Sequence, residues 1–199
     1  MVDDQLAARD IHDERVLAAL RRVPRHEDVE ADPIDAYDDR PLPIGHGVTI
    51  SQPYIVALMT QALAVNDTDR VLEVGTGSGY GAAVLAELAA HVTTIEMIEP
   101  LAIAARTRLA DRYDHVEVVY GDGTIGHPPG APYDAISVTA AGPAIPPPLL
   151  EQLAPGGRLV MPVGRGVERL VRLTRGPDGD VTEELTAVRF VPLQGRHGV

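Results

Sequence analysis

The sequence predicts an α/β fold built on a doubly wound, mostly parallel, seven-stranded sheet. From Asp69 onward, short apolar runs alternate with stretches of helical apolar spacing, which is typical of parallel strands joined by crossover helices. The last two apolar runs are separated by residues 175–180, which read RGPDGD. Because clustered Gly, Pro and Asp are typical of hairpin turns, these two strands are expected to form an antiparallel edge.

The first third of the chain is expected to hold two helices with a long irregular segment between them. Apolar residues at helical spacing predict a helix over residues 3–22, which ends before Pro24 because the residue preceding a proline disfavours helical conformation. Prolines and glycines crowd residues 24–50, and long ordered loops are commonly functional. A second helix is expected over residues 52–64, with Ser51 as its N-cap.

The remaining strands and helices follow from the same patterns. Seven strands are expected over residues 70–73, 92–95, 116–120, 135–139, 157–162, 169–174 and 182–190. Three helices are expected over residues 79–90, 100–113 and 146–153. In open sheets of this kind, ligands bind beyond the carboxyl ends of the strands, so the residues that follow each strand are the first candidates for a site.

The most informative motif follows the first of these strands, where residues 72–80 read LEVGTGSGY. Glycine suits such a turn because it accepts positive φ and lets a ligand approach the backbone. A dinucleotide site needs G-x-G-x-x-G, and a P-loop needs a Lys, which this chain lacks. A hydrolase elbow needs glycines where Thr76 and Tyr80 flank Ser78. The E/D-x-G-x-G-x-G loop of S-adenosylmethionine (AdoMet) methyltransferases fits without adjustment, although a purely structural turn stays open on this motif alone.

Two further strand ends carry residues that suit a nucleoside. Glu96 ends the second strand, where a carboxylate can accept hydrogen bonds from both ribose hydroxyls. After the third strand, Asp122 could accept a hydrogen bond from the adenine amine, and the Gly123 N–H could donate to a ring nitrogen. Singly, Glu96 could be an exposed acid and Asp122 part of an ordinary turn. In order on successive strands, the three features favour a nucleoside-bearing cofactor.

The composition argues against several other functions. The net charge is −12, which disfavours a nucleic acid partner. The absence of Cys excludes disulfides and thiolate zinc sites, and the His residues show no ligand spacing, so no metal site is expected. Neither a membrane-length apolar stretch nor a signal peptide is visible, so we expect a cytoplasmic protein.

A resemblance to a known family rests on residues 41–54, which read PLPIGHGVTISQPY. This segment is similar to the signature of protein-L-isoaspartate O-methyltransferases, whose bacterial members carry L-P-I-G-x-G-x-T-I-S-Q-P. The similarity runs from residues 13–17 to the end of the chain, with Val48 where many members have Gln. It implies a Rossmann-like class I AdoMet methyltransferase fold in one domain, 1–199. Residues 1–68 would then form N-terminal helices and a substrate loop, and residues 69–199 the AdoMet-binding core.

The resemblance also implies roles for individual positions. Ser51 matches the family's active-site serine, which lies near the transferred methyl group and the substrate carboxylate. The implied cofactor-binding residues are Glu73, Gly75, Thr76, Gly77, Ser78, Glu96, Asp122 and Gly123. The implied substrate-binding residues are Thr49, Ile50, Gln52, Pro53, Val191, Pro192 and Leu193, of which the last three belong to a segment that closes over the site.

The implied reaction is methyl transfer from AdoMet to the α-carboxylate of an L-isoaspartyl residue in a damaged protein or peptide. The ester then cyclises to a succinimide, and hydrolysis returns some normal aspartate. Because the sulfonium is already electrophilic and the carboxylate is ionised at neutral pH, no general base is needed. The rate then depends on alignment of the reacting atoms and on partial removal of water.

Three rival functions stay open at this point. The same chemistry could act on a dedicated ribosomal precursor peptide. A small-molecule O-methyltransferase would need a deprotonating group near Ser51, and a non-catalytic AdoMet-binding protein would need no active serine. The expected partners are isoaspartyl peptides and proteins, with no nucleic acid or membrane partner, and we expect a monomer.

Overall fold

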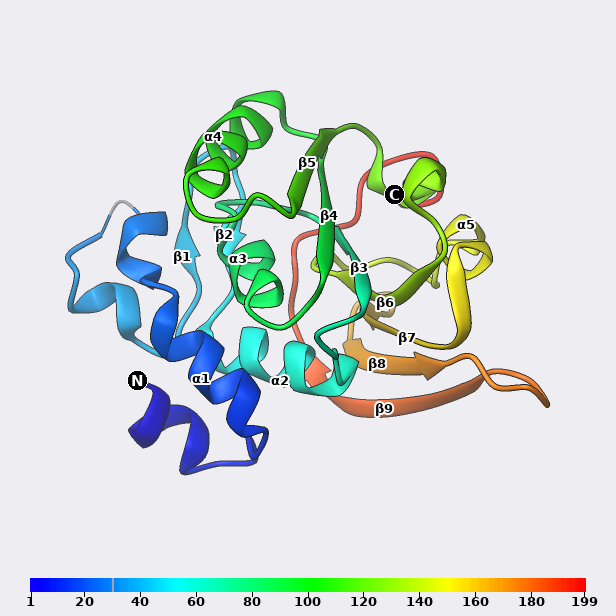
Figure 1. Cartoon of the computed structure of the whole chain (residues 1–199), viewed down its shortest axis with the longest axis horizontal. Coiled ribbons are helices and arrows are strands. Elements are labelled where there is room, and N and C mark those ends of the chain that lie inside the picture. The colour runs from blue at the N-terminus through cyan, green and yellow to red at the C-terminus, as the bar shows by residue number, and fades with distance from the viewer. Residues whose placement is uncertain (30) are drawn as a thin grey trace.

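The computed structural model describes residues 1–29 and 31–199, and its centre is a seven-stranded sheet. The spatial order is β5-β4-β3-β6-β7-β8-β9 (Figure 1). The strands are β3 (Arg70–Val74), β4 (His91–Glu96), β5 (Val116–Tyr120), β6 (Tyr133–Val138), β7 (Leu153–Val163), β8 (Glu168–Thr174) and β9 (Val181–Val188). Neighbours from β5 to β7 pair in parallel, whereas β8 is antiparallel to both β7 and β9. The predicted mostly parallel sheet with an antiparallel edge is therefore confirmed.

Helices cover both faces of the sheet, and each face buries its own apolar core. The first core packs against α1 (Glu14–Arg22), α2 (Pro53–Leu63), α3 (Tyr80–Ala86) and α4 (Glu99–Ala110). The second core includes a residue of α5 (Pro147–Glu151). Successive strand residues point to opposite faces, so Val71 joins the first core and Leu72 the second. Over the described ranges, the structure contains no helix long and apolar enough to cross a membrane.

The N-terminal helix differs from the prediction because it is interrupted. A π-helical segment spans Val2–Ala7, and α1 begins only at Glu14. The carboxylate of Asp13 accepts hydrogen bonds from the backbone N–H groups of Arg15 and Val16, at 2.8 and 3.3 Å. An N-cap of this kind favours a new helix start, so the predicted continuous helix over residues 3–22 is wrong.

The segment before α2 also differs in detail from the prediction. Gln52, not Ser51, is the N-cap of α2, and its side chain makes no capping hydrogen bond. Within the region predicted to be irregular, β1 (Leu42–Pro43) and β2 (Thr49–Ile50) form a small antiparallel sheet. This pairing places the residues just before Ser51 in an ordered strand.

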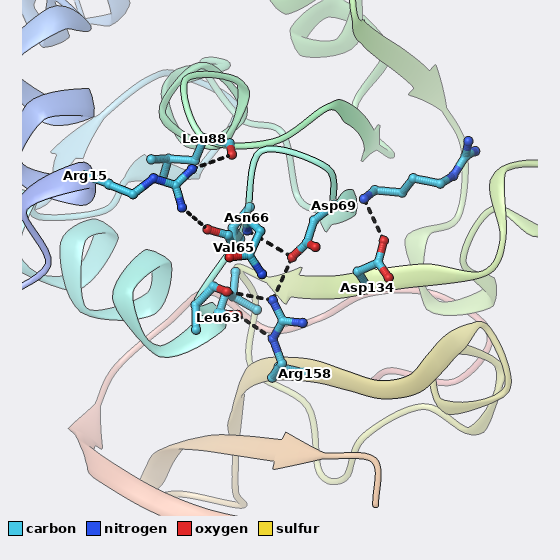
Figure 2. A network of polar contacts seen from close by, with 10 residues as sticks. Arg15, Leu63, Val65, Asn66, Asp69, Leu88, Asp134 and Arg158 are labelled. Atoms are coloured by element: carbon cyan, nitrogen blue, oxygen red, sulfur yellow. Dashed lines mark hydrogen bonds and ion pairs between the residues drawn. The ribbon is translucent and has the colours of Figure 1, made fainter.

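The C-terminal end of α2 is held by two arginines, one from the sheet and one from α1 (Figure 2). Arg158 of β7 donates to the carbonyl oxygens of Leu63 and Ala64 at 2.7 and 2.8 Å. It also donates to the carboxylate of Asp69 at 2.7 Å. Arg15 of α1 donates to the carbonyl oxygen of Val65 at 2.7 Å. The last carbonyl groups of a helix lack internal partners, so these contacts hold α2 in place.

Candidate functional site

Two adjoining cavities lie beyond the carboxyl ends of β3, β4 and β6. The smaller, of about 390 Å³, is the glycine-loop cavity, whose lining includes Gly75, Gly77, Glu96 and Gly123. The larger, of about 730 Å³, is the serine cavity, whose lining includes Arg9, Ser51, Gln52, Tyr54 and Arg189. Thr49, Thr139 and Val191 line both cavities. Molecules bound in the two cavities can therefore touch each other.

The glycine loop after β3 has the backbone geometry that only glycine accepts readily. Gly75 and Gly77 have φ angles of 97° and 55°, in the left-handed region. A side chain on Gly75 would collide with the hydroxyl of Thr139. The loop therefore presents backbone rather than side chains to the cavity, which is what close approach of a ligand requires.

Glu96 connects the glycine loop to the start of α4. Its Oε2 accepts a hydrogen bond from the Gly77 N–H at 2.8 Å, and its Oε1 accepts one from the Ile98 N–H at 2.9 Å. Each carboxylate oxygen can accept more than one hydrogen bond. Since Glu96 lines the glycine-loop cavity, its carboxylate has acceptor capacity left for ligand hydroxyls.

Glu73 lies beneath the loop and is only 1% exposed. The Thr94 hydroxyl donates to its carboxyl group at 2.6 Å, and the Thr76 hydroxyl lies 2.6 Å from that of Thr94. Burial raises the pKa of Glu73 from 4.5 to about 8; the hydrogen bond from Thr94 opposes this rise and nearby Glu96 adds to it. Glu73 therefore supports the loop from below as a neutral acid at pH 7.

Asp122 faces the C-terminal segment. Its carboxylate accepts hydrogen bonds from the backbone and hydroxyl of Thr124, at 2.9 and 2.7 Å, and from the Arg196 N–H at 2.8 Å. Partial burial acts to raise the pKa of Asp122, but these hydrogen bonds outweigh it and lower the pKa. Its predicted contact with adenine stays a prediction, whereas neighbouring Gly123 does line the glycine-loop cavity.

The C-terminal segment runs beside β6 and forms one wall of both cavities. Ala141 donates a backbone hydrogen bond to Val191 at 2.8 Å and accepts one from Leu193 at 2.7 Å. Val191 lines both cavities, whereas Pro192 and Leu193 line the glycine-loop cavity and not the serine cavity. The C-terminal segment therefore forms part of the boundary between the two cavities.

The structure gathers most, but not all, of the predicted residues around these cavities. The predicted cofactor residues outside the lining of the glycine-loop cavity are Glu73, Thr76, Ser78 and Asp122. The predicted substrate residues in the lining of the serine cavity, besides Ser51, are Thr49, Gln52 and Val191. Ile50 and Pro53 are buried beside it, so they shape the segment without lining either cavity.

Sequence reasoning missed several residues that line the site. Thr139 follows β6, and its hydroxyl donates to the Gly75 carbonyl at 2.8 Å; applying the strand-end criterion to β6 would have identified it. Tyr54 ends the segment 41–54 on which the family resemblance rests, whereas Arg9 and Arg189 carry no comparable local signal. Among the described residues, no group of three or more His, Asp or Glu side chains is placed to hold a metal ion.

Fold and site together define a class I AdoMet-dependent methyltransferase. A structure of a protein-L-isoaspartate O-methyltransferase matches this chain with a TM-score of 0.86 at 27% identity, over 93% of this chain and 62% of that one. The chain thus spans less than two thirds of that protein. A second structure is that of a Plasmodium falciparum protein described as a protein-L-isoaspartate O-methyltransferase, in complex with S-adenosyl-L-homocysteine. It matches with a TM-score of 0.83 at 25% identity, over 97% of this chain and 96% of that one.

The particular family follows from the whole sequence. A family model described as "Protein-L-isoaspartate(D-aspartate) O-methyltransferase (PCMT)" matches residues 1–198, and the chain belongs to this family. It is 57% identical to the protein-L-isoaspartate O-methyltransferase of Methanoculleus marisnigri, over 100% of this chain and 91% of that protein. It is 58% identical to protein-L-isoaspartate O-methyltransferase 1 of Rhodopseudomonas palustris (strain HaA2), over 100% and 83%. The family resemblance stated from the sequence is confirmed.

Proposed function

We propose that this chain transfers a methyl group from AdoMet to the α-carboxylate of L-isoaspartyl residues in damaged proteins and peptides, which begins repair through a succinimide. Membership of the family supports this activity. The structural observation that carries it is the shared wall of Thr49, Thr139 and Val191 between the two cavities. A cofactor in one cavity can present a group to a peptide in the other.

We assign the glycine-loop cavity to AdoMet, which supplies an electrophilic methyl group when bound. Glu96 would accept hydrogen bonds from the ribose hydroxyls, and the loop from Gly75 to Gly77 would bind the methionine end through its backbone; the position of these residues in the cavity lining supports both roles. Ile95 and Ile98 add apolar surface to this lining, which suits a flat purine ring. The chemistry of these lining residues supports the assignment.

We assign the serine cavity to the isoaspartyl peptide, with Ser51 as the residue that holds the reacting carboxylate. Its hydroxyl can donate a hydrogen bond to the carboxylate without accepting a proton. Among the described residues that line this cavity there is no Asp, Glu or His. An acceptor that is already ionised needs no general base, so this lining suits a carboxylate better than an alcohol.

The rival functions receive less support. The names of the relatives favour repair over a dedicated precursor peptide, a small-molecule acceptor or a non-catalytic role. We further propose a monomer acting in the cytoplasm on isoaspartyl proteins, without a nucleic acid or membrane partner. Within one domain, residues 1–68 would supply much of the peptide side of the site and residues 69–199 the cofactor side.

The decisive experiment uses paired peptides that are identical except for L-isoaspartate or normal L-aspartate. Methyl incorporation from labelled AdoMet is expected as base-labile label on the isoaspartyl member alone, across several unrelated sequences. Absence of label on both members, with AdoMet binding intact in calorimetry, would contradict the proposed activity.

A further inference from the structure

One ion pair in the wall of the serine cavity is not explained by the roles assigned above. Arg9 follows the first helical segment, and its Nη1 donates to Asp39 Oδ2 at 2.9 Å. Its guanidinium also stacks on Tyr54, with Cζ 3.4 Å from the ring centroid. Arg9 and Tyr54 line the serine cavity together with Ser51. The pair therefore lies beside the proposed carboxylate site.

Asp39 caps the helix that follows Ser51. Its Oδ1 accepts a hydrogen bond from the Tyr54 N–H at 2.9 Å, and its Oδ2 lies 3.4 Å from the donor Nε2 of Gln52. A carboxylate at a helix N-terminus is favourable, because it satisfies a free N–H and faces the positive end of the helix dipole. Asp39 thus supplies the cap that the Gln52 side chain does not.

This cap creates an electrostatic difficulty for the reaction, because the substrate group is also a carboxylate. Asp39 Oδ2 lies 3.4 Å from the side chain of Gln52, which follows Ser51 and lines the same cavity. Charges closer together than the Debye length, about 8–10 Å at ordinary salt, are only partly screened. An uncompensated Asp39 would therefore repel an anion approaching Ser51.

The positive charge of Arg9 offsets the negative charge of Asp39. In a chain of net charge −12, the described lining of the serine cavity contains two arginines, Arg9 and Arg189, and no carboxylate. Asp39 keeps its capping contact with Tyr54 through one oxygen while Arg9 binds the other. The cap is thereby retained and its charge is offset.

We propose that Arg9 is a positioning residue for peptide binding: it neutralises Asp39, so that the capped start of α2 can hold the anionic isoaspartyl carboxylate at Ser51. This inference rests on the proposed function. Because the methyl ester is uncharged, the pair acts on binding of the substrate and not on release of the product. Its loss should therefore raise KM for the peptide and leave kcat and cofactor affinity nearly unchanged.

The test is a charge-compensation series on the full-length enzyme with one isoaspartyl peptide. Arg9→Gln is expected to raise KM about 5-fold, the upper end of the effects measured for exposed charge pairs. Adding Asp39→Asn, which keeps an oxygen for the Tyr54 N–H, is expected to restore KM to within about 2-fold of wild type, because the repelling charge is gone. Arg9→Lys, which keeps the charge, should stay near wild type, and added salt should lower the KM of Arg9→Gln.

Arg112→Gln provides a matched control. The side chains of Arg9 and Arg112 are 46% and 47% exposed and pair with a carboxylate at 2.9 and 2.7 Å, but Arg112 pairs with Glu27 away from the serine cavity. This control should leave KM unchanged. An unchanged KM in Arg9→Gln, or a double variant no better than Arg9→Gln, would overturn the role of charge. If wild type binds S-adenosyl-L-homocysteine but methylates no isoaspartyl peptide, the proposed function fails, and this inference fails with it.

Discussion

Glu73 and Thr94 are joined by a 2.6 Å hydrogen bond that lies wholly inside the protein, directly beneath the glycine loop. The two residues come from neighbouring parallel strands, at positions paired in the β3–β4 register. A side chain on Gly81, in the first turn of α3, would collide with the same carboxyl group. The acid of the glycine-loop motif is therefore part of the support of the loop and not part of its ligand-facing surface.

The buried Glu73 predicts a pH dependence of stability. The folded protein raises the pKa of this group from 4.5 to about 8. Between these values the unfolded chain releases a proton that the folded chain keeps, so the free energy of unfolding falls as pH rises, by at most about 1.4 kcal/mol per unit. The stabilisation that Glu73 contributes is fully present below pH 4.5 and is lost progressively as the pH rises to about 8. Above that pH, Glu73 causes no further change in the free energy of unfolding.

Urea unfolding of wild type and Glu73→Gln between pH 5 and pH 9 checks this prediction. The Gln variant keeps a carbonyl oxygen for the Thr94 hydroxyl and should show a flatter pH profile than wild type. The exposed Glu183 provides a control, since Glu183→Gln should keep the wild-type slope. Identical slopes in Glu73→Gln and wild type would show that Glu73 ionises normally in the folded state.

The proposed role of Ser51 predicts a loss of activity without a loss of cofactor binding. Ser51→Ala removes the hydroxyl that would hold the substrate carboxylate. A hydrogen bond to a charged group contributes roughly 1.5–3 kcal/mol, so kcat/KM for an isoaspartyl peptide should fall about 10- to 100-fold. Ser51 does not line the glycine-loop cavity, so calorimetric affinity for S-adenosyl-L-homocysteine should be unchanged. A large loss of that affinity would contradict the assignment.

The sheet and the cofactor side of the site could be predicted because their signals are local. Most strands show as short apolar runs, and Glu96 and Gly123 stand at or just after strand ends, where the fold places them together. The interruption before α1 was missed because apolar spacing continues across it, although Asp13 is a capping residue type. The spacing of apolar residues indicates whether a segment is a helix or a strand better than it indicates where that segment begins and ends.

Contacts between distant parts of the chain could not be predicted in the same way. Arg9 reaches Asp39 across 30 positions, and Asp122 accepts a hydrogen bond from Arg196 across 74. Asp122 was predicted from its place after a strand, but the direction of its side chain depends on the C-terminal segment. Such directions follow from tertiary packing, on which a single sequence pattern carries no information.

The ion pair of Asp69 and Arg158 predicts a large effect on stability. The two side chains are only 10% and 14% exposed, and Arg158 also holds the last carbonyl groups of α2 (Figure 2). Removing one partner of a buried pair leaves the other charge uncompensated, at a cost of about 3–5 kcal/mol. Asp69→Ala should lower the free energy of urea unfolding by this order. Asp134→Ala provides a control, because it removes only an acceptor for the Arg70 N–H and should cost about 1 kcal/mol of unfolding free energy. Equal losses of unfolding free energy in the two variants would contradict a special role for the ion pair.

The position of Gly123 predicts that a side chain there would disturb both the glycine-loop cavity and the apolar core that contains Val74. A side chain at this position would collide with Cγ1 of Val74, which is buried at the end of β3. The φ angle of Gly123 is not in the left-handed region, so Gly123→Ala acts through this collision and not through backbone strain. Overpacking of this kind typically costs about 1–3 kcal/mol, and the displaced backbone should also weaken binding of S-adenosyl-L-homocysteine.

A double variant separates the collision from other causes. Val74→Ala alone should destabilise the protein by creating a cavity, but it provides the space that the new methyl group at position 123 requires. The combined Gly123→Ala and Val74→Ala variant should therefore lose less stability than the sum of the two single losses, and should recover cofactor affinity relative to Gly123→Ala. Urea unfolding and calorimetry on the four proteins measure both effects. Strict additivity would place the cost of Gly123→Ala elsewhere, in the approach of the cofactor itself.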